Sequence, residues 1–239
     1  MLLEVCAGSI HDCIAAVDGG ADRLELNAAL STSGLTPSIG TIQEVTSSTD
    51  VPVIVMIRPR EGNFQYSRQE ISVMEHDIHA VLDAGADGVA FGVLSDDGSI
   101  DTAVCRRLIA AAQGREAVFH RAFDCTPDPL QALETCIDLG FTRVLTSGQE
   151  PCAVDGAPLI RHLVKRAGRK IEVLPGGCIT ADSVKELVRD TGCSQVHGTF
   201  SAHVSANTSS VLDFSYKAVD VEKVRAVRNR LDELSYPAG

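Results

Sequence analysis

The chain repeats one pattern of apolar and polar positions four times. In each copy an Asp is followed by one residue, a Gly, two or three linking residues and a strand-like alternation of apolar side chains. The Gly suits the position just after a helix, where φ is positive and a side chain would clash. The pattern therefore predicts four helix-to-strand junctions, at "DGGADRLEL" (18–26), "DAGADGVAF" (83–91), "DLGFTRVLT" (138–146) and "DTGCSQVHG" (190–198).

Four further apolar runs lie between these junctions and predict four more strands, "LLEVC" (2–6), "VPVIVMI" (51–57), "EAVFHRAF" (116–123) and "KIEVLP" (170–175). Apolar residues at steps of three and four indicate helices between the strands, over 10–17, 71–82, 103–112, 129–137, 159–167 and 184–190. Ser67 and Glu70 have the spacing of a capping box at a helix start. A last helix is predicted over 220–234.

Eight alternating strand–helix units in about 240 residues predict an α/β fold, a (β/α)8 TIM-type barrel, as a single domain over 1–239. A doubly wound open sheet is the alternative. The first strand is followed by "VCAGSI", which has one glycine and lacks the GxGxxG pattern of a dinucleotide site. We therefore expect no nucleotide cofactor.

The balance of charge bears on partners. The 239 residues carry a formal net charge of −11, which would repel a nucleic-acid backbone or an anionic bilayer. We expect neither as a partner. The chain opens on a strand-like segment rather than a signal peptide, and no run is long enough to span a membrane, so we expect a cytoplasmic protein. The eight cysteines are scattered without a CxxC pair, and we expect them to be reduced.

Polar side chains follow several predicted strands at the end where barrels carry their functional groups. The first strand ends in Glu4 and Cys6, the second in Glu25 and Asn27, and the third in Arg58 and Arg60. Because side chains alternate along a strand, we expect both glutamates inside the barrel, with Arg58 as their counterion. The same pattern fits a structural Glu–Arg network and a catalytic site.

The fifth predicted strand ends in the polar cluster His120, Arg121 and Asp124. A histidine titrates near neutral pH, so His120 is a candidate general acid or base, and His197 on the last strand is a second histidine at the mouth. A hydrogen-bonded core histidine is the alternative for each.

Glycine-rich segments follow strands six, seven and eight, and glycine lets backbone amides approach an anion. The candidate residues for a phosphate or carboxylate cradle are Ser147, Gly148, Gly176, Gly177, His197 and Gly198. Arg58 and Arg60 add positive charge. The alternative is that these glycines only form tight turns.

Two cysteines fall at strand ends, Cys6 and Cys178, and thiolates are preferred ligands of Cu(I). Buried cysteines that act only as small apolar side chains are the alternative, and they account for Cys13, Cys105, Cys136 and Cys193. Cys125 and Cys152 are loop residues without an assigned role.

The motifs "LEVC", "GGADRLEL", "GLTPSIGTI", "VMIRPREGNFQYS", "GADGVAFGVLSDDGSID", "FHRAFD", "LTSG" and "PGGCI" occur in order over residues 2 to about 200. They resemble the CutC family, named for copper homeostasis. The resemblance implies a TIM-type barrel, a cytoplasmic location, a homo-oligomer and a Cu(I) ligand at Cys6. The family's second cysteine, in "ELC", is Asn27 here, and its "PGGG" is "PGGC". We therefore hypothesise that Cys178 replaces the missing thiol.

Two functions remain open. The first is copper homeostasis, with Cu(I) bound at the barrel mouth by Cys6 and Cys178. The second is an enzyme that acts on a small phosphorylated or carboxylated metabolite by acid/base chemistry, with the polar set Glu4, Glu25, Arg58, His120, Arg121 and Asp124. The partner is a metal ion in one case and a small molecule in the other.

Overall fold

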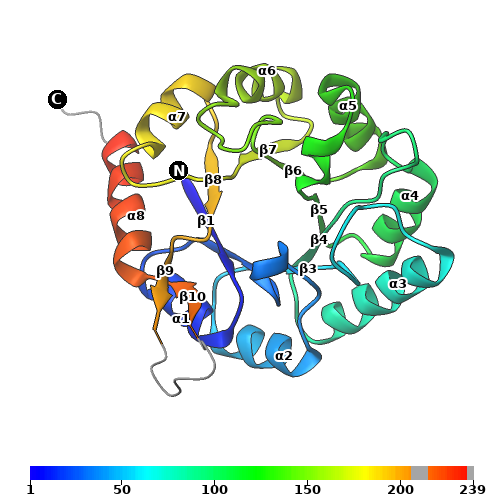
Figure 1. The fold of residues 1–239 in the computed structure, drawn as a ribbon, viewed down its shortest axis with the longest axis horizontal. Coiled ribbons are helices and arrows are strands. Elements are labelled where there is room, and N and C mark those ends of the chain that lie inside the picture. The colour runs from blue at the N-terminus through cyan, green and yellow to red at the C-terminus, as the bar shows by residue number, and fades with distance from the viewer. Residues whose placement is uncertain (206–214, 236–239) are drawn as a thin grey trace.

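Eight parallel strands form the centre of the computed structural model, which describes residues 1–205 and 215–235. The hydrogen-bonded order is β7-β6-β5-β4-β3-β2-β1-β8, and a parallel bridge between Gly176 and His197 joins the two ends, so the barrel is nearly closed. Figure 1 shows the ring of strands. Their bounds are β1 Leu2–Ala7, β2 Arg23–Leu26, β3 Val53–Met56, β4 Gly88–Phe91, β5 Glu116–Phe119, β6 Arg143–Thr146, β7 Glu172–Pro175 and β8 Gln195–Gly198.

Helices surround the strands (Figure 1). They are α1 Ile10–Asp18, α2 Ile39–Ser48, α3 Arg68–Asp83, α4 Thr102–Ala111, α5 Pro129–Leu139, α6 Ala157–Ala167, α7 Val184–Thr191 and α8 Val221–Ser235. The predicted (β/α)8 barrel is confirmed. Helix α2 was not among the helices that we identified, because only three of its apolar residues follow helical spacing. In the described ranges, no helix is long and apolar enough to cross a bilayer.

The repeated glycine has the predicted role at the helix-to-strand junctions. Gly20, Gly85, Gly140 and Gly192 all have positive φ, between 71° and 97°. The capping box is also present, since the Ser67 hydroxyl accepts from the Glu70 amide while the Glu70 carboxylate accepts from the Ser67 amide. These local signals explain why the helices start and stop where they do.

The strand predicted over 116–123 is shorter than expected. Strand β5 ends at Phe119, and Arg121–Cys125 forms a 3-10 turn, η2. The His120 ring caps this turn, because its Nδ1 accepts from the Ala122 amide at 3.2 Å. The polar end of "AVFHRAFD" is therefore a turn that leaves the barrel mouth.

The barrel interior has a polar layer at the amino-terminal ends of the strands. Arg23, Arg143 and Gln195 are the first residues of their strands, and all three are buried. Arg23 pairs with Glu4 and donates to Gln195, and Arg143 pairs with Glu116 and Glu172 at 2.8 and 2.9 Å. An apolar cluster also lies among the strands and contains Ile54, Ala90, Val118, Leu145 and Leu174.

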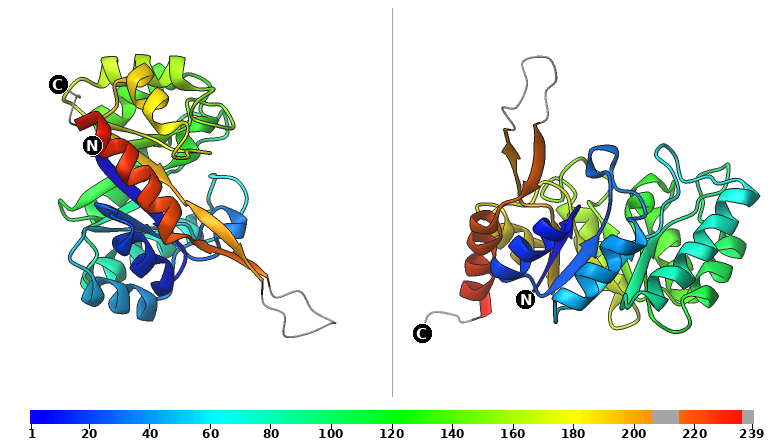
Figure 2. Two further views of the ribbon diagram at one scale, coloured as in Figure 1. Left: turned by 90° about the vertical axis from the view of Figure 1, so that its left-hand side faces the viewer. Right: turned by 90° about the horizontal axis from the view of Figure 1, so that it is seen from below.

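A two-stranded antiparallel hairpin interrupts the last strand–helix unit. It pairs β9 Ser201–Val204 with β10 Tyr216–Val219, and Figure 2 shows it projecting from the barrel before the chain enters α8. The hydrophobic pattern did not predict it.

Candidate functional site

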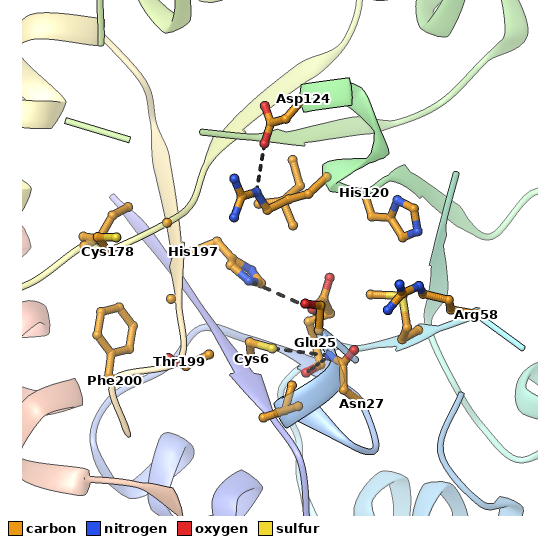
Figure 3. Close-up of a pocket in the computed structure, with 18 of the residues that line it drawn as sticks. Cys6, Glu25, Asn27, Arg58, His120, Asp124, Cys178, His197, Thr199 and Phe200 are labelled. Carbon is orange, nitrogen blue, oxygen red and sulfur yellow. Dashed lines mark hydrogen bonds and ion pairs between the residues drawn. The ribbon is translucent and has the colours of Figure 1, made fainter. Parts of the chain in front are cut away.

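A cavity of about 510 Å³ opens at the carboxyl ends of the strands. Figure 3 shows how side chains from several strands point into it. Ten of the candidate residues line the cavity: Cys6, Glu25, Arg58, His120, Arg121, Asp124, Gly177, Cys178, His197 and Gly198. Apolar and aromatic residues that sequence reasoning missed, including Phe64 and Phe200, complete the wall. Phe64 and Phe200 lie in loops, where no periodicity marks them.

Three buried side chains converge in this cavity. One ligand atom each from Cys6, Glu25 and His197 lies within 4.8 Å of the others. The register of the barrel brings them together, because Cys6 on β1 stands opposite Glu25 on β2, and β8 with His197 flanks β1 on its other side. A thiol, a carboxylate and an imidazole at this separation can hold a metal ion.

Glu4 orients the His197 ring through a hydrogen bond to its Nδ1 atom. The Nδ1 atom of His197 lies 2.8 Å from Glu4 Oε1, while Nε2 lies 4.0 Å from Glu25 Oε2. Burial alone would raise the pKa of Glu4, but the His197 hydrogen bond and the Arg23 charge outweigh it and lower that pKa. For His197, burial acts to lower the pKa, but the Glu25 charge and the Glu4 bond prevail and raise it. A carboxylate on Nδ1 leaves Nε2 for a ligand.

Asn27 holds the side chains of Cys6 and Glu25 in place. Its Nδ2 donates to Glu25 Oε2 at 2.9 Å and to Cys6 Sγ at 3.3 Å. Turning the amide over would set its oxygen against the Glu25 carboxylate, so the amide nitrogen faces the site. Burial, and next the Glu25 charge, raise the pKa of the Cys6 thiol. Asn27 is thus a positioning residue.

Arg58 is not the counterion of the glutamates, contrary to the prediction. Its guanidinium donates to the carbonyls of Thr32 and Gly34 at 2.9 Å and of Gly62 at 2.8 Å. Arg23, which no motif singled out, pairs with Glu4 instead. The sequence could not distinguish the two arginines, because the register of β1 with β2, which sets Arg23 opposite Glu4, decides which one reaches the carboxylate. Arg60 pairs with Glu70 at the start of α3.

His120 is buried against Phe64, with ring centroids 4.9 Å apart. Burial, and next the Arg58 charge, lower the pKa of His120 to about 3. The neutral ring accepts at Nδ1 from the Ala122 amide, so Nε2 carries the proton. His120 is therefore a hydrogen-bond donor near neutral pH rather than a charged acid.

Arg121 and Asp124 form an ion pair with 2.8 Å between Nε and Oδ2. The Asp124 carboxylate also accepts from the Thr146 hydroxyl at 2.5 Å and from the Ser147 and Gln149 amides. Asp124 thus holds the loop after β6 to η2. These bonds occupy much of its capacity to accept a proton from a substrate.

The predicted anion cradle is divided. Gly177, His197 and Gly198 line the cavity, while Ser147, Gly148 and Gly176 are not among its lining residues. A Cβ on Gly148 would lie 2.4 Å from the Gly156 carbonyl oxygen, so this glycine serves close backbone packing. The cradle stays a prediction for the residues that line the cavity.

Cys178 forms a disulfide with Cys152, 26 residues earlier. The prediction that all eight cysteines are reduced is therefore wrong, and Cys178 has no thiolate to replace the one missing at Asn27. The bond joins the loop after β6 to the loop after β7. Cys152 was expected to be a loop residue without a role, because sequence spacing alone cannot show which loops meet.

The fold and the cavity define a (β/α)8 barrel whose polar groups converge at the carboxyl ends of its strands. The sequence pattern of the CutC family matches residues 1–202. The chain belongs to the CutC family, as the resemblance implied.

Individual relatives agree. The chain is 50% identical to a CutC family protein of Treponema denticola over 195 residues, which cover 82% of this chain and 79% of the relative. It is 43% identical to the human copper homeostasis protein cutC homolog over 238 residues, which cover 95% and 87%. A crystal structure of a CutC protein from Streptococcus agalactiae superposes with a TM-score of 0.80 at 36% identity, covering 83% of this chain and 98% of that one.

Proposed function

We propose that this protein serves copper homeostasis by binding Cu(I) at the barrel mouth, with Cys6 and His197 as its main ligands. The convergence of Cys6, Glu25 and His197 within 4.8 Å carries the proposal. The human relative's name refers to copper homeostasis. Homo-oligomerisation and a cytoplasmic location stay predictions from the family resemblance.

Two of the three donors, the Cys6 thiolate and the His197 imidazole, suit a soft ion such as Cu(I). A thiolate and a neutral imidazole are good ligands of Cu(I), and the thiolate neutralises the charge of the ion. Glu25 offers a harder oxygen at the same point. Asn27, which replaces the family's second cysteine, takes no part as a ligand because its amide nitrogen faces the site.

Binding must remove a proton from the Cys6 thiol, whose pKa is raised by burial and by Glu25. The ion must therefore compete with protons, and affinity should fall as the pH falls. Glu4 keeps His197 oriented, so that its Nε2 faces the other donors.

An anaerobic titration with Cu(I) against a competing chelator tests the proposal. We expect one equivalent to bind to the native protein and this binding to be lost in Cys6→Ser and weakened in His197→Gln. Cys13→Ser is the matched control, because Cys13 is equally buried but lies on α1, outside the cavity lining. Thermal unfolding of each variant checks that it is folded.

A complementary variant is Asn27→Cys, which sets a second thiol beside Cys6, where Asn27 Nδ2 now lies 3.3 Å from the sulfur. We expect it to bind Cu(I) more tightly. Binding that is equal in the native protein and in Cys6→Ser would contradict the proposal. So would native affinity no greater than that of a simple exposed thiol.

The second prediction, an enzyme acting on a small anionic metabolite by acid/base chemistry, remains as an alternative. Its polar set is dispersed, because Glu4 pairs with Arg23 and His197 while Asp124 is bonded to the loop after β6. Arg58 and His120 are the members that favour an anionic ligand.

A further inference from the structure

One wall of the cavity carries a buried positive charge without a negative partner. Arg58 is 4% exposed, and within the described parts of the chain no carboxylate forms an ion pair with it. Its terminal nitrogens donate to three backbone carbonyls, and its Nε has no hydrogen-bond partner. The buried Tyr66 hydroxyl is a further polar neighbour of the guanidinium, but it is neutral, because burial raises its pKa, and it does not balance the charge. A buried cation that lacks a counterion is costly, and so is a buried donor that lacks an acceptor.

A second unsatisfied donor is found at the same wall. His120 is 3% exposed, and its Nε2 also has no partner among the described residues. Both side chains pack on Phe64, with the Arg58 Cζ 5.3 Å and the His120 ring 4.9 Å from its centroid. In Figure 3 Arg58 and His120 lie on one side of the cavity, apart from Cys6 and His197.

A water molecule would satisfy the two donors but leave the guanidinium charge unpaired. An anion satisfies both requirements. Arg121, which also lines the cavity, is already paired with Asp124, and His197 lies beside Glu4 and Glu25. The demand for negative charge therefore falls on the wall formed by Arg58 and His120.

We propose that Arg58 and His120 form a subsite for the carboxylate group of a small organic acid, whose remaining atoms occupy the apolar part of the cavity. Two unpartnered N–H groups match the two oxygens of a carboxylate. A phosphate, with more oxygens and more charge, would need further donors, and among the described side chains that line the cavity only Arg58 and His120 have a buried donor without a partner. The apolar lining includes Leu30, Met56, Leu145 and Ile179.

The subsite goes beyond the proposed copper site and uses none of its ligands. The anion lies on the Arg58 side, while Glu25 supplies negative charge on the side of Cys6 and His197. A molecule within the cavity of about 510 Å³ can contact both sides. Small-molecule binding and copper binding can therefore succeed or fail separately.

The test follows the His120 Nε2–H signal by NMR in the metal-free protein during titration with formate and with benzoate. Benzamide is the uncharged counterpart of benzoate, and inorganic phosphate is the competing anion. We expect a saturable shift with one or both carboxylates below about 50 mM and none with benzamide.

Two substitutions of His120 distinguish the role of its Nε2–H donor from the role of its Nδ1 atom in capping η2. His120→Asn keeps an acceptor for the Ala122 amide but removes the Nε2–H, whereas His120→Gln keeps a donor near Nε2. Backbone amide shifts at the cavity report binding in both variants. We expect about tenfold or more weaker binding in His120→Asn, a smaller loss in His120→Gln, and native binding in His11→Asn, whose histidine is exposed on α1.

Three outcomes would overturn the inference. The first is no saturable shift with either carboxylate, which would indicate that water satisfies the two donors. The second is equal binding of benzoate and benzamide, and the third is tighter binding of phosphate than of both carboxylates. None of these results affects the copper titration, which is measured without added carboxylate.

Discussion

Replacing His120 should make the protein less sensitive to acid. His120 is neutral in the folded state because burial and the Arg58 charge lower its pKa to about 3, from an ordinary value of 6.5. In the unfolded chain the imidazole takes up a proton below about pH 6.5. Between these values the unfolded state binds more protons, so acid favours unfolding and stability rises with pH.

The magnitude follows from this window. Each pH unit in which only the unfolded chain is protonated costs about 1.4 kcal/mol of stability. Between about pH 6 and about pH 4.5, His120 should therefore remove about 2 kcal/mol from the free energy of unfolding. The raised pKa of His197 has the opposite sign, but its contribution changes only above about pH 6.5. The lowered pKa of Glu4 matters mainly below about pH 4.5.

Urea unfolding at both pH values measures the effect for the native protein, His120→Asn and the exposed control His11→Asn. We expect the loss between about pH 6 and about pH 4.5 to be about 2 kcal/mol smaller in His120→Asn than in the other two. Comparing each protein with itself removes any general destabilisation by the substitution. An equal loss in all three would refute the assignment of a neutral, buried His120.

Two further predictions concern the loops around the mouth. Replacing Cys152 and Cys178 together by Ser should lower the stability of the oxidised protein by about 3 kcal/mol, because the disulfide closes a loop of 26 residues. A reductant should lower the stability of the native protein to the same value. An unchanged denaturation midpoint in the double variant would contradict this prediction. Gly156→Ala should destabilise the protein by about 1–3 kcal/mol, because the new Cβ would lie 2.0 Å from the Ser147 carbonyl oxygen. The control Gly40→Ala, which has open space at its Cβ, should change stability by less than about 1 kcal/mol. Similar melting temperatures for the two variants would contradict this close packing.

Local patterns were sufficient to predict the barrel. The Asp-x-Gly junctions, the apolar runs and the Ser67 capping box each depend on a few neighbouring residues, and each has the predicted structure. Strand ends also located the cavity, since the carboxyl ends of parallel strands meet at one face. The failures were helix α2, whose apolar positions are few, and the β9–β10 hairpin, which has no strong alternation.

The sequence could not predict the contacts between segments that are far apart in the chain. It identified Cys6, Glu25 and His197 as mouth residues, but only the register of β1 with β2 and β8 brings their ligand atoms within 4.8 Å. Residue types could not show that Arg23, rather than Arg58, neutralises Glu4, or that Cys178 meets Cys152. Periodicity and turn chemistry act over a few residues, so the sequence alone determined the elements and their order. Ion pairs, the disulfide and unsatisfied donors depend on the register of the strands and on which loops meet in space, and the tertiary structure decided those.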